Sequence, residues 1–166
     1  NHELAERAKD VSEKVKDITE FLVDIGSNIE YLRRRRMHLG RTTPSVEHRS
    51  FAGKRVAYHD ACHLVHSQKV SHQPRELIKD IPGIEFVELP ESTWCCGSAG
   101  IYNITRYDDS MKLLARKVEN IKHIRPDVIV TGNPGCILQI QYGLEKEGLN
   151  IELLHTATFL RRAYEA

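Results

Sequence analysis

From Arg55 onward, short apolar runs alternate with segments of helical periodicity, and this alternation restricts the fold more than any other feature of the chain. Strands are predicted over 56–58, 84–89, 128–130 and 151–154, and helices over 74–80, 108–124, 137–147 and 157–164. Strands that alternate with helices form parallel sheets through right-handed crossovers, with helices on both faces. We therefore predict an α/β fold with a four-stranded parallel Rossmann-like sheet.

The residues before this region follow a different pattern. Apolar residues recur at alternating steps of four and three from Leu4 to Ile25, which predicts an amphipathic helix ending near Gly26. Such a stripe is typical of a helix packed on its own domain or on a neighbour, and a short coiled coil is the alternative. A linker with a short helix at 28–38 is predicted to follow. The predicted parts are an N-terminal helix and linker over 1–53 and an α/β domain over 54–166.

The composition is that of an ordinary globular chain. Of its 166 residues, 40% are hydrophobic and 28% are charged, and the net charge is +1. No apolar run approaches the roughly 18 to 20 residues that cross a bilayer. We therefore predict no transmembrane segment and no nucleic-acid partner, and we expect the basic run 33–36 to be solvated or to contact another domain. Because the first residue is Asn1 rather than Met, we expect a piece of a longer polypeptide.

Four cysteines carry the chemistry that the sequence suggests: Cys62, the adjacent pair Cys95 and Cys96, and Cys136. On the predicted fold they follow the carboxyl ends of the first three strands, where open parallel sheets bind ligands. Four thiolates are the ligand count of a four-iron cluster or of a tetrahedral zinc ion. Adjacent cysteines seldom pair with each other, and the cysteines are sparse for a secreted disulfide scaffold. A reducing compartment with metal or redox chemistry is therefore favoured.

The segments around the cysteines suit a negatively charged centre. Glycines in 97–100 and 132–135 let backbone amides approach sulfur closely. Cys136 is expected in the first turn of a helix, where the helix dipole favours a thiolate. Histidines expected at the same edge of the sheet, as donors around the ligands, are His59, His63 and His155.

Three motifs occur in order: His59-Asp-Ala-Cys-His-Leu, Cys95-Cys-Gly-Ser-Ala-Gly preceded by Glu88-Leu-Pro-Glu, and Thr131-Gly-Asn-Pro-Gly-Cys-Ile-Leu-Gln. Together they resemble the cysteine-rich CCG domain of heterodisulfide reductase B subunits and their relatives, especially the C-terminal part of glycolate oxidase iron–sulfur subunits. The resemblance implies an electron carrier in which Cys62, Cys95, Cys96 and Cys136 bind a 4Fe–4S cluster. It also implies partners beyond this chain, namely FAD-containing oxidase subunits and, in the same polypeptide, an N-terminal ferredoxin-like segment and a first CCG region.

The sequence departs from the heterodisulfide reductase pattern at Gln139, where that pattern has a further cysteine. An ordinary four-thiolate cluster, a depleted cluster and zinc all stay open as the metal content, and the fragment can also be purified empty. We predict an iron–sulfur electron-transfer module of a glycolate or other 2-hydroxy acid oxidase complex. It has no predicted catalytic residue of its own, and it is expected in the cytoplasm, at most peripheral to the inner membrane through partners. The alternatives are a structural zinc module for subunit assembly and a thiol redox protein that uses the adjacent cysteines.

Overall fold

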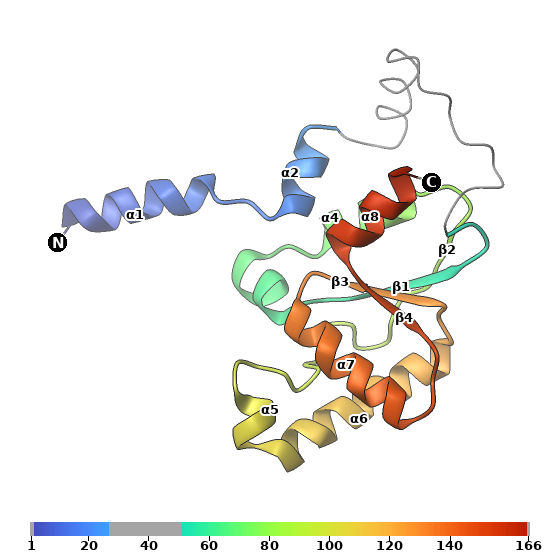
Figure 1. Ribbon diagram of the computed structural model, residues 1–166. Coiled ribbons are helices and arrows are strands. Elements are labelled where there is room, and N and C mark those ends of the chain that lie inside the picture. The colour runs from blue at the N-terminus through green and yellow to red at the C-terminus, as the bar shows by residue number, and fades with distance from the viewer. Residues whose placement is uncertain (1, 27–50, 166) are drawn as a thin grey trace.

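The computed structural model describes residues 2–26 and 51–165 and contains the predicted four-stranded sheet. The strands β1 (Arg55–His59), β2 (Glu85–Phe86), β3 (Val128–Thr131) and β4 (Glu152–His155) lie in the order β2-β1-β3-β4, and all neighbours are parallel (Figure 1). The chain places β2 on one side of β1 and β3 on the other. The strand order therefore reverses direction between β1 and β3, which is a topological switch point. Ligands of open α/β sheets bind beyond the carboxyl ends of the strands at such a point.

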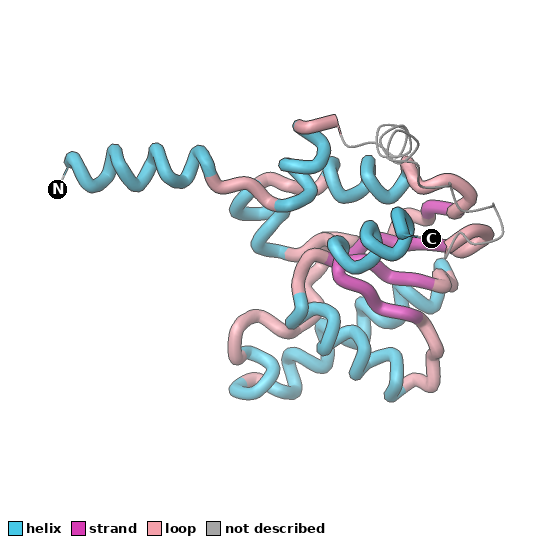
Figure 2. Tube along the Cα trace, turned by 45° about the horizontal axis from the view of Figure 1, so that its top comes forward, coloured by secondary structure: helices cyan, strands magenta, loops and turns pink. Residues whose placement is uncertain are grey.

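Helices cover both faces of the sheet, as the alternating sequence pattern predicts (Figures 1 and 2). The helices α4 (His72–Lys79) and α8 (Thr156–Glu165) pack on one face. The helices α6 (Tyr107–Ile124) and α7 (Pro134–Lys146) pack on the other, and the short α5 (Tyr102–Thr105) precedes α6. These four long helices begin one to three residues earlier than the sequence predicts, and α7 does so because proline fits its first position.

Successive side chains of the central strands enter opposite layers of the core. Val56 and Tyr58 pack in the cluster with α4 and α8, whereas Ala57 packs in the cluster with α6 and α7. The same alternation separates Val130 from Ile129 in β3. The same alternation along β1 points the next residue, His59, toward the layer of α6 and α7. The pleat of β1 thus delivers a buried imidazole to the layer that also contains Cys96 and Cys136.

The predicted N-terminal helix is wrong in one respect, because the structure divides it into α1 (His2–Lys14) and α2 (Ile18–Asp24). Asp17 caps α2: its Oδ1 accepts from the Thr19 amide at 2.9 Å, and its own amide donates to Glu20 at 2.9 Å. This reciprocal capping box starts a new helix although the apolar stripe continues. Helix α2 packs on α4. By contrast, none of the α1 residues is buried by the described parts of the chain, and α1 extends away from the sheet (Figure 1).

Strand β2 is shorter than predicted, because only two of the residues in 84–89 pair as a strand. The Val87 amide still donates to Val56 at 2.9 Å, but Pro90 has no amide hydrogen with which to continue the ladder. The chain leaves the sheet there and turns toward the cysteine pair. The linker predicted over 27–53 and its helix at 28–38 lie almost wholly outside the described residues, so the predicted division at residue 53 stays a prediction. Among the helices that the structure describes, none has the length and apolar character to cross a membrane.

Candidate metal centre

A cavity of about 490 Å³ opens beyond the carboxyl ends of β1 and β3, at the topological switch point. All four cysteines line it, so three segments far apart in sequence meet at one edge of the sheet. The remaining lining residues belong to the same three segments and are His59, Asp60, His63, Ser98, Ala99, Gly100, Asn133 and Gly135. The structure therefore brings the predicted sulfur donors together, while their role as ligands stays a prediction.

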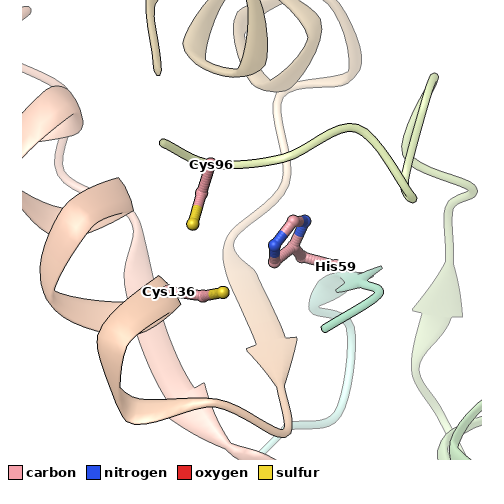
Figure 3. A group of neighbouring side chains, drawn as sticks. All are labelled: His59, Cys96 and Cys136. Atoms are coloured by element: carbon pink, nitrogen blue, oxygen red, sulfur yellow. The ribbon is translucent and has the colours of Figure 1, made fainter. Parts of the chain in front are cut away.

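Three donors in the cavity form a compact, buried group (Figure 3). One ring nitrogen of His59 and the Sγ atoms of Cys96 and Cys136 all lie within 4.8 Å of one another. The exposed fractions of these residues are 1%, 2% and 5%. Cys62 and Cys95 are half-buried on the same cavity. Neither of them belongs to the compact group found among the described residues. The donors thus combine a tight trio with two thiols at wider spacing.

Cys136 lies in the first turn of α7, as the sequence predicts. Asn133 caps this helix, because its Oδ1 accepts from the amides of Gly135 at 2.7 Å and Cys136 at 3.2 Å. The Asn133 Nδ2 also lies 3.2 Å from Nδ1 of His63, the first residue of the short π-helix η2 (His63–Gln68) that follows Cys62. One asparagine therefore fixes the start of α7 and connects it to the segment that follows Cys62.

The turn after the adjacent cysteines requires glycine. Gly97 has a φ of +93°, and a Cβ at this position would lie 2.6 Å from the carbonyl oxygen of Ser110. The Gly97 amide donates to Sγ of Cys95 at 3.3 Å, which is the predicted approach of a backbone amide to sulfur. The Ser110 hydroxyl donates to the Gly97 carbonyl at 2.8 Å. Helix α6 thus holds the turn that presents both thiols.

Gln139, at the position of the missing fifth cysteine, supports this turn from α7. Its Nε2 donates to Oγ of Ser110 at 3.0 Å, and its Oε1 accepts from Nδ2 of Asn103 in α5 at 3.2 Å. The side chain is 6% exposed. A buried amide therefore links α5, α6 and α7 and acts on Gly97 through Ser110. The sequence analysis identified the lost thiol but missed this structural role.

A comparison with known families decides where the chain belongs. The sequence matches the CCG cysteine-rich domain over residues 56–141, the segment that contains all four cysteines and three of the strands. The chain belongs to the CCG cysteine-rich domain family. The predicted resemblance is confirmed.

Curated relatives of this CCG domain include an iron-sulfur subunit, a fumarate reductase subunit and a lactate utilization protein. The chain is 41% identical over 144 residues to the probable glycolate oxidase iron-sulfur subunit of Bacillus subtilis, covering 86% of the chain and 30% of that protein. It is 39% identical over 111 residues to a subunit of the fumarate reductase (CoM/CoB) of Methanothermobacter marburgensis, covering 66% and 23%. It is 30% identical over 106 residues to the lactate utilization protein A of Oceanobacillus iheyensis, covering 64% and 43%. The chain thus spans less than half the length of these relatives.

The three histidines that were predicted to surround the ligands do not all line the cavity. Within the described residues, the lining of the cavity includes His59 and His63 but not His155. Nδ1 of His155 accepts from the Ala157 amide at 3.3 Å, so its Nε2 carries the hydrogen and donates to the Gly132 carbonyl at 3.3 Å. His155 therefore holds the loop before Cys136 and uses both ring nitrogens to do so.

A buried ion pair, whose arginine the sequence analysis missed, anchors the loop before Cys62. Asp60 is 2% exposed, and Arg75 of α4 binds it with two hydrogen bonds, Nη1 to Oδ1 at 2.8 Å and Nη2 to Oδ2 at 2.6 Å. Arg75 also donates to the Ser71 carbonyl at 2.8 Å and to Oγ of Ser92 at 3.2 Å. Such a planar two-pronged contact fixes direction as well as distance. It sets the path of the chain between His59 and Cys62.

The thiols of the adjacent pair hold their protons when no metal is bound. A hydrogen bond with Cys96 raises the pKa of Cys95, and burial raises it further. A hydrogen bond with Cys136 raises the pKa of Cys96 to about 11. Metals bind thiolates, so binding to this pair releases protons and is favoured as the pH rises.

The metal-free CCG domain is expected to lose stability in mild acid because of His59. Burial, and then the charge of Lys117, lower the pKa of His59 to about 4, below the value of about 6.5 for an unfolded chain. Between these values the unfolded chain binds a proton that the folded state does not, so the free energy of unfolding falls as the pH falls. At about pH 4.5 the loss from this one group amounts to about 2 to 3 kcal/mol relative to about pH 7.

Denaturant unfolding of the metal-free protein at both pH values measures this loss. The variant His59→Gln is expected to show no such loss of stability between the two pH values. The control His66→Gln changes an exposed histidine seven residues further along the chain and should lose as much stability as the wild type. Equal pH dependence in the wild type and in His59→Gln would contradict the prediction.

Proposed function

We propose that this CCG domain holds an iron–sulfur centre and carries electrons within a glycolate or other 2-hydroxy acid oxidase complex. The observation that supports the proposal most is the meeting of all four thiols on one cavity at the carboxyl edge of the sheet. The names of the relatives from Bacillus subtilis and Oceanobacillus iheyensis point to the same kind of complex.

The donor set fits a centre of several atoms. The cavity volume is about 490 Å³, whereas one water molecule has a share of about 30 Å³ in the liquid. Cys62 and Cys95 line the cavity but lie outside the compact trio found among the described residues, so a centre that reaches every thiol must be extended. A 4Fe–4S cluster takes four cysteine ligands. We assign these ligands to Cys62, Cys95, Cys96 and Cys136.

A bound cluster would supply one-electron transfer, and the residues of this chain would hold and adjust it. Burial of Cys96 and Cys136 keeps water away from their sulfur atoms. The Gly97 amide directs positive charge at Cys95, and the His59 ring lies beside two of the sulfur atoms. Hydrogen bonds to ligand sulfur stabilise its negative charge and raise the reduction potential.

We assign oxidation of the hydroxy acid to FAD-containing partner subunits, from which this domain receives electrons. The full polypeptide is proposed to add a ferredoxin-like segment and a first CCG region, because the chain spans 30% of its relative from Bacillus subtilis. The complex would operate in the cytoplasm, where thiols stay reduced, and would reach the inner membrane only through partners.

Anaerobic reconstitution with iron and sulfide tests the proposal. We expect about four iron and four acid-labile sulfide per chain, with a broad absorption band at about 400 nm that bleaches on reduction. Parallel samples with iron alone serve as the control and should stay without sulfide and without the band. Protein that binds zinc stoichiometrically and takes up no sulfide would refute the iron–sulfur assignment.

Zinc is the second candidate, and the compact trio is the observation that favours it. Zinc binds sulfur at about 2.3 Å and nitrogen at about 2.0 Å, and donors within 4.8 Å of one another need little movement to reach one ion. Cys95, which is hydrogen-bonded to Cys96 of the trio, would complete a tetrahedron. In that case the protein is colourless, and a chelator lowers its melting temperature.

A further inference from the structure

Lys117 is a buried cation that contacts the loop leading to the cysteine pair. It lies on α6 with an exposed fraction of 0%. Its Nζ donates to the backbone carbonyls of Glu91 at 2.5 Å and Ser92 at 3.4 Å. Both carbonyls belong to the loop that leads from β2 to the cysteine pair. Lysine is almost never fully buried unless its charge is paired. A buried ammonium group that contacts this loop therefore indicates a specific function for Lys117.

The same contacts tie two cysteine loops together. The Ser92 carbonyl that Lys117 approaches also accepts from the Asp60 amide at 3.2 Å. Asp60 lines the cavity two residues before Cys62. Lys117 therefore contacts the point where the loop of Cys62 and the loop of the adjacent cysteines meet.

The charge of Lys117 also depends on its surroundings. Burial lowers the pKa of Lys117 to about 8, and the negative charges of a Cys96 thiolate, of Glu91, of Asp60 and of a Cys136 thiolate act in the opposite direction. The charge of Lys117 in turn contributes to the lowered pKa of His59. A negatively charged centre at this position would favour the ammonium form further.

We propose that Lys117 is a positioning residue with a second role as the built-in counter-charge of the centre. It fixes the loop of the cysteine pair, and it stabilises the reduced form of an iron–sulfur centre, an inference that rests on the proposed function. Reduction adds one electron to the centre. A nearby cation in a region of low dielectric constant stabilises the added negative charge and raises the reduction potential.

Two neutral substitutions separate the two roles. Lys117→Gln removes the charge and keeps a side-chain donor for the loop carbonyls, whereas Lys117→Met removes both. For Lys117→Gln we expect at least a tenfold fall in the ratio of reduced to oxidised centre at a fixed potential, which is about 59 mV toward lower potential for one electron. For Lys117→Met we expect the same shift together with a lower melting temperature of the metal-free protein. The matched control Lys112→Gln changes an exposed lysine of the same helix and should leave the potential unchanged.

Spectroelectrochemical titration of the reconstituted protein gives the readout. A wild type that takes up no iron and sulfide refutes the proposed function before any variant is compared. A loaded Lys117→Gln variant with the midpoint of the wild type and of Lys112→Gln refutes the role of Lys117 and leaves the proposed function intact. Lys117→Arg, which keeps the charge, covers the case in which neutral variants fail to fold. Its ratio of reduced to oxidised centre should stay within about threefold of the wild type, and a tenfold shift would overturn the proposal.

Discussion

Cys136→Ser is expected to retain less than about a tenth of the iron and sulfide that the wild-type CCG domain takes up. Cys136 is buried, and its sulfur lies in the compact group with donor atoms of His59 and Cys96. Loss of this thiolate therefore removes a ligand from the point where the other donors meet. A serine hydroxyl is close to the thiol in size but does not supply a thiolate ligand. Iron, sulfide and absorbance after identical reconstitution measure the loss.

Leu138→Ser is the matched control for this substitution, because Leu138 lies two residues further along α7 and is 72% exposed. It should take up iron and sulfide as the wild type does. The metal-free forms should share their circular dichroism spectra, which separates loss of a ligand from loss of the fold. Full uptake by Cys136→Ser would contradict the assignment of this thiol.

Cys62→Ser then distinguishes a cluster from a single ion. An extended centre with four thiolate ligands needs Cys62, whereas an ion held by the compact trio does not. Loss of bound metal in both cysteine variants supports the cluster. Retention of one metal ion in Cys62→Ser alone supports zinc.

Arg75→Met is expected to lower the free energy of unfolding by about 3 to 5 kcal/mol. The substitution keeps an apolar stem but leaves the carboxylate of Asp60 buried and without its two charged hydrogen bonds. Breaking one side of a buried ion pair costs far more than breaking an exposed pair. Denaturant unfolding of the metal-free protein at about pH 7 measures the change.

Arg162→Met provides the comparison, because the ion pair of Arg162 with Glu152 is exposed on both sides. Its loss should stay below about 1 kcal/mol. The double variant Asp60→Asn with Arg75→Met should be more stable than Arg75→Met alone, since no buried charge is left. Equal losses in the single variants Arg75→Met and Arg162→Met would show that the buried pair is no anchor.

The sheet and its reactive edge could be predicted from the sequence. Short runs such as Val128–Val130 are too brief for helices and are rich in β-branched residues, and the helical segments between them require parallel pairing. Parallel strands end on one edge, so the positions of Cys62 and Cys136 after their strands were enough to expect them together. That expectation needed no knowledge of side-chain contacts.

The break between α1 and α2 was missed although its signal is in the sequence. Asp17-Ile-Thr-Glu20 is a capping-box pattern, but the apolar stripe runs through it without interruption. Periodicity reports which face of a segment is apolar, and it does not report where the backbone hydrogen bonds end.

The supporting polar residues could not be found from local pattern. Lys117 and Gln139 read as ordinary polar residues on amphipathic helices, yet both are buried. Their partners Glu91 and Ser110 lie 26 and 29 residues away in sequence. Burial of this kind follows from how loops and helices meet in three dimensions, which spacing along one helix does not specify.

The pleat of β1 also makes the tolerance of this chain to insertions and deletions uneven. One residue inserted within 55–58 would turn each following side chain of the strand to the opposite face of the sheet. His59 would then point away from the face with the metal-binding cavity, and Tyr58 would point toward it. By contrast, the turns that enter β3 and β4 lie at the opposite edge and can change length without moving a sulfur atom. A homologue of altered length is therefore expected to differ at those turns and to keep the number of residues between the start of β1 and Cys62.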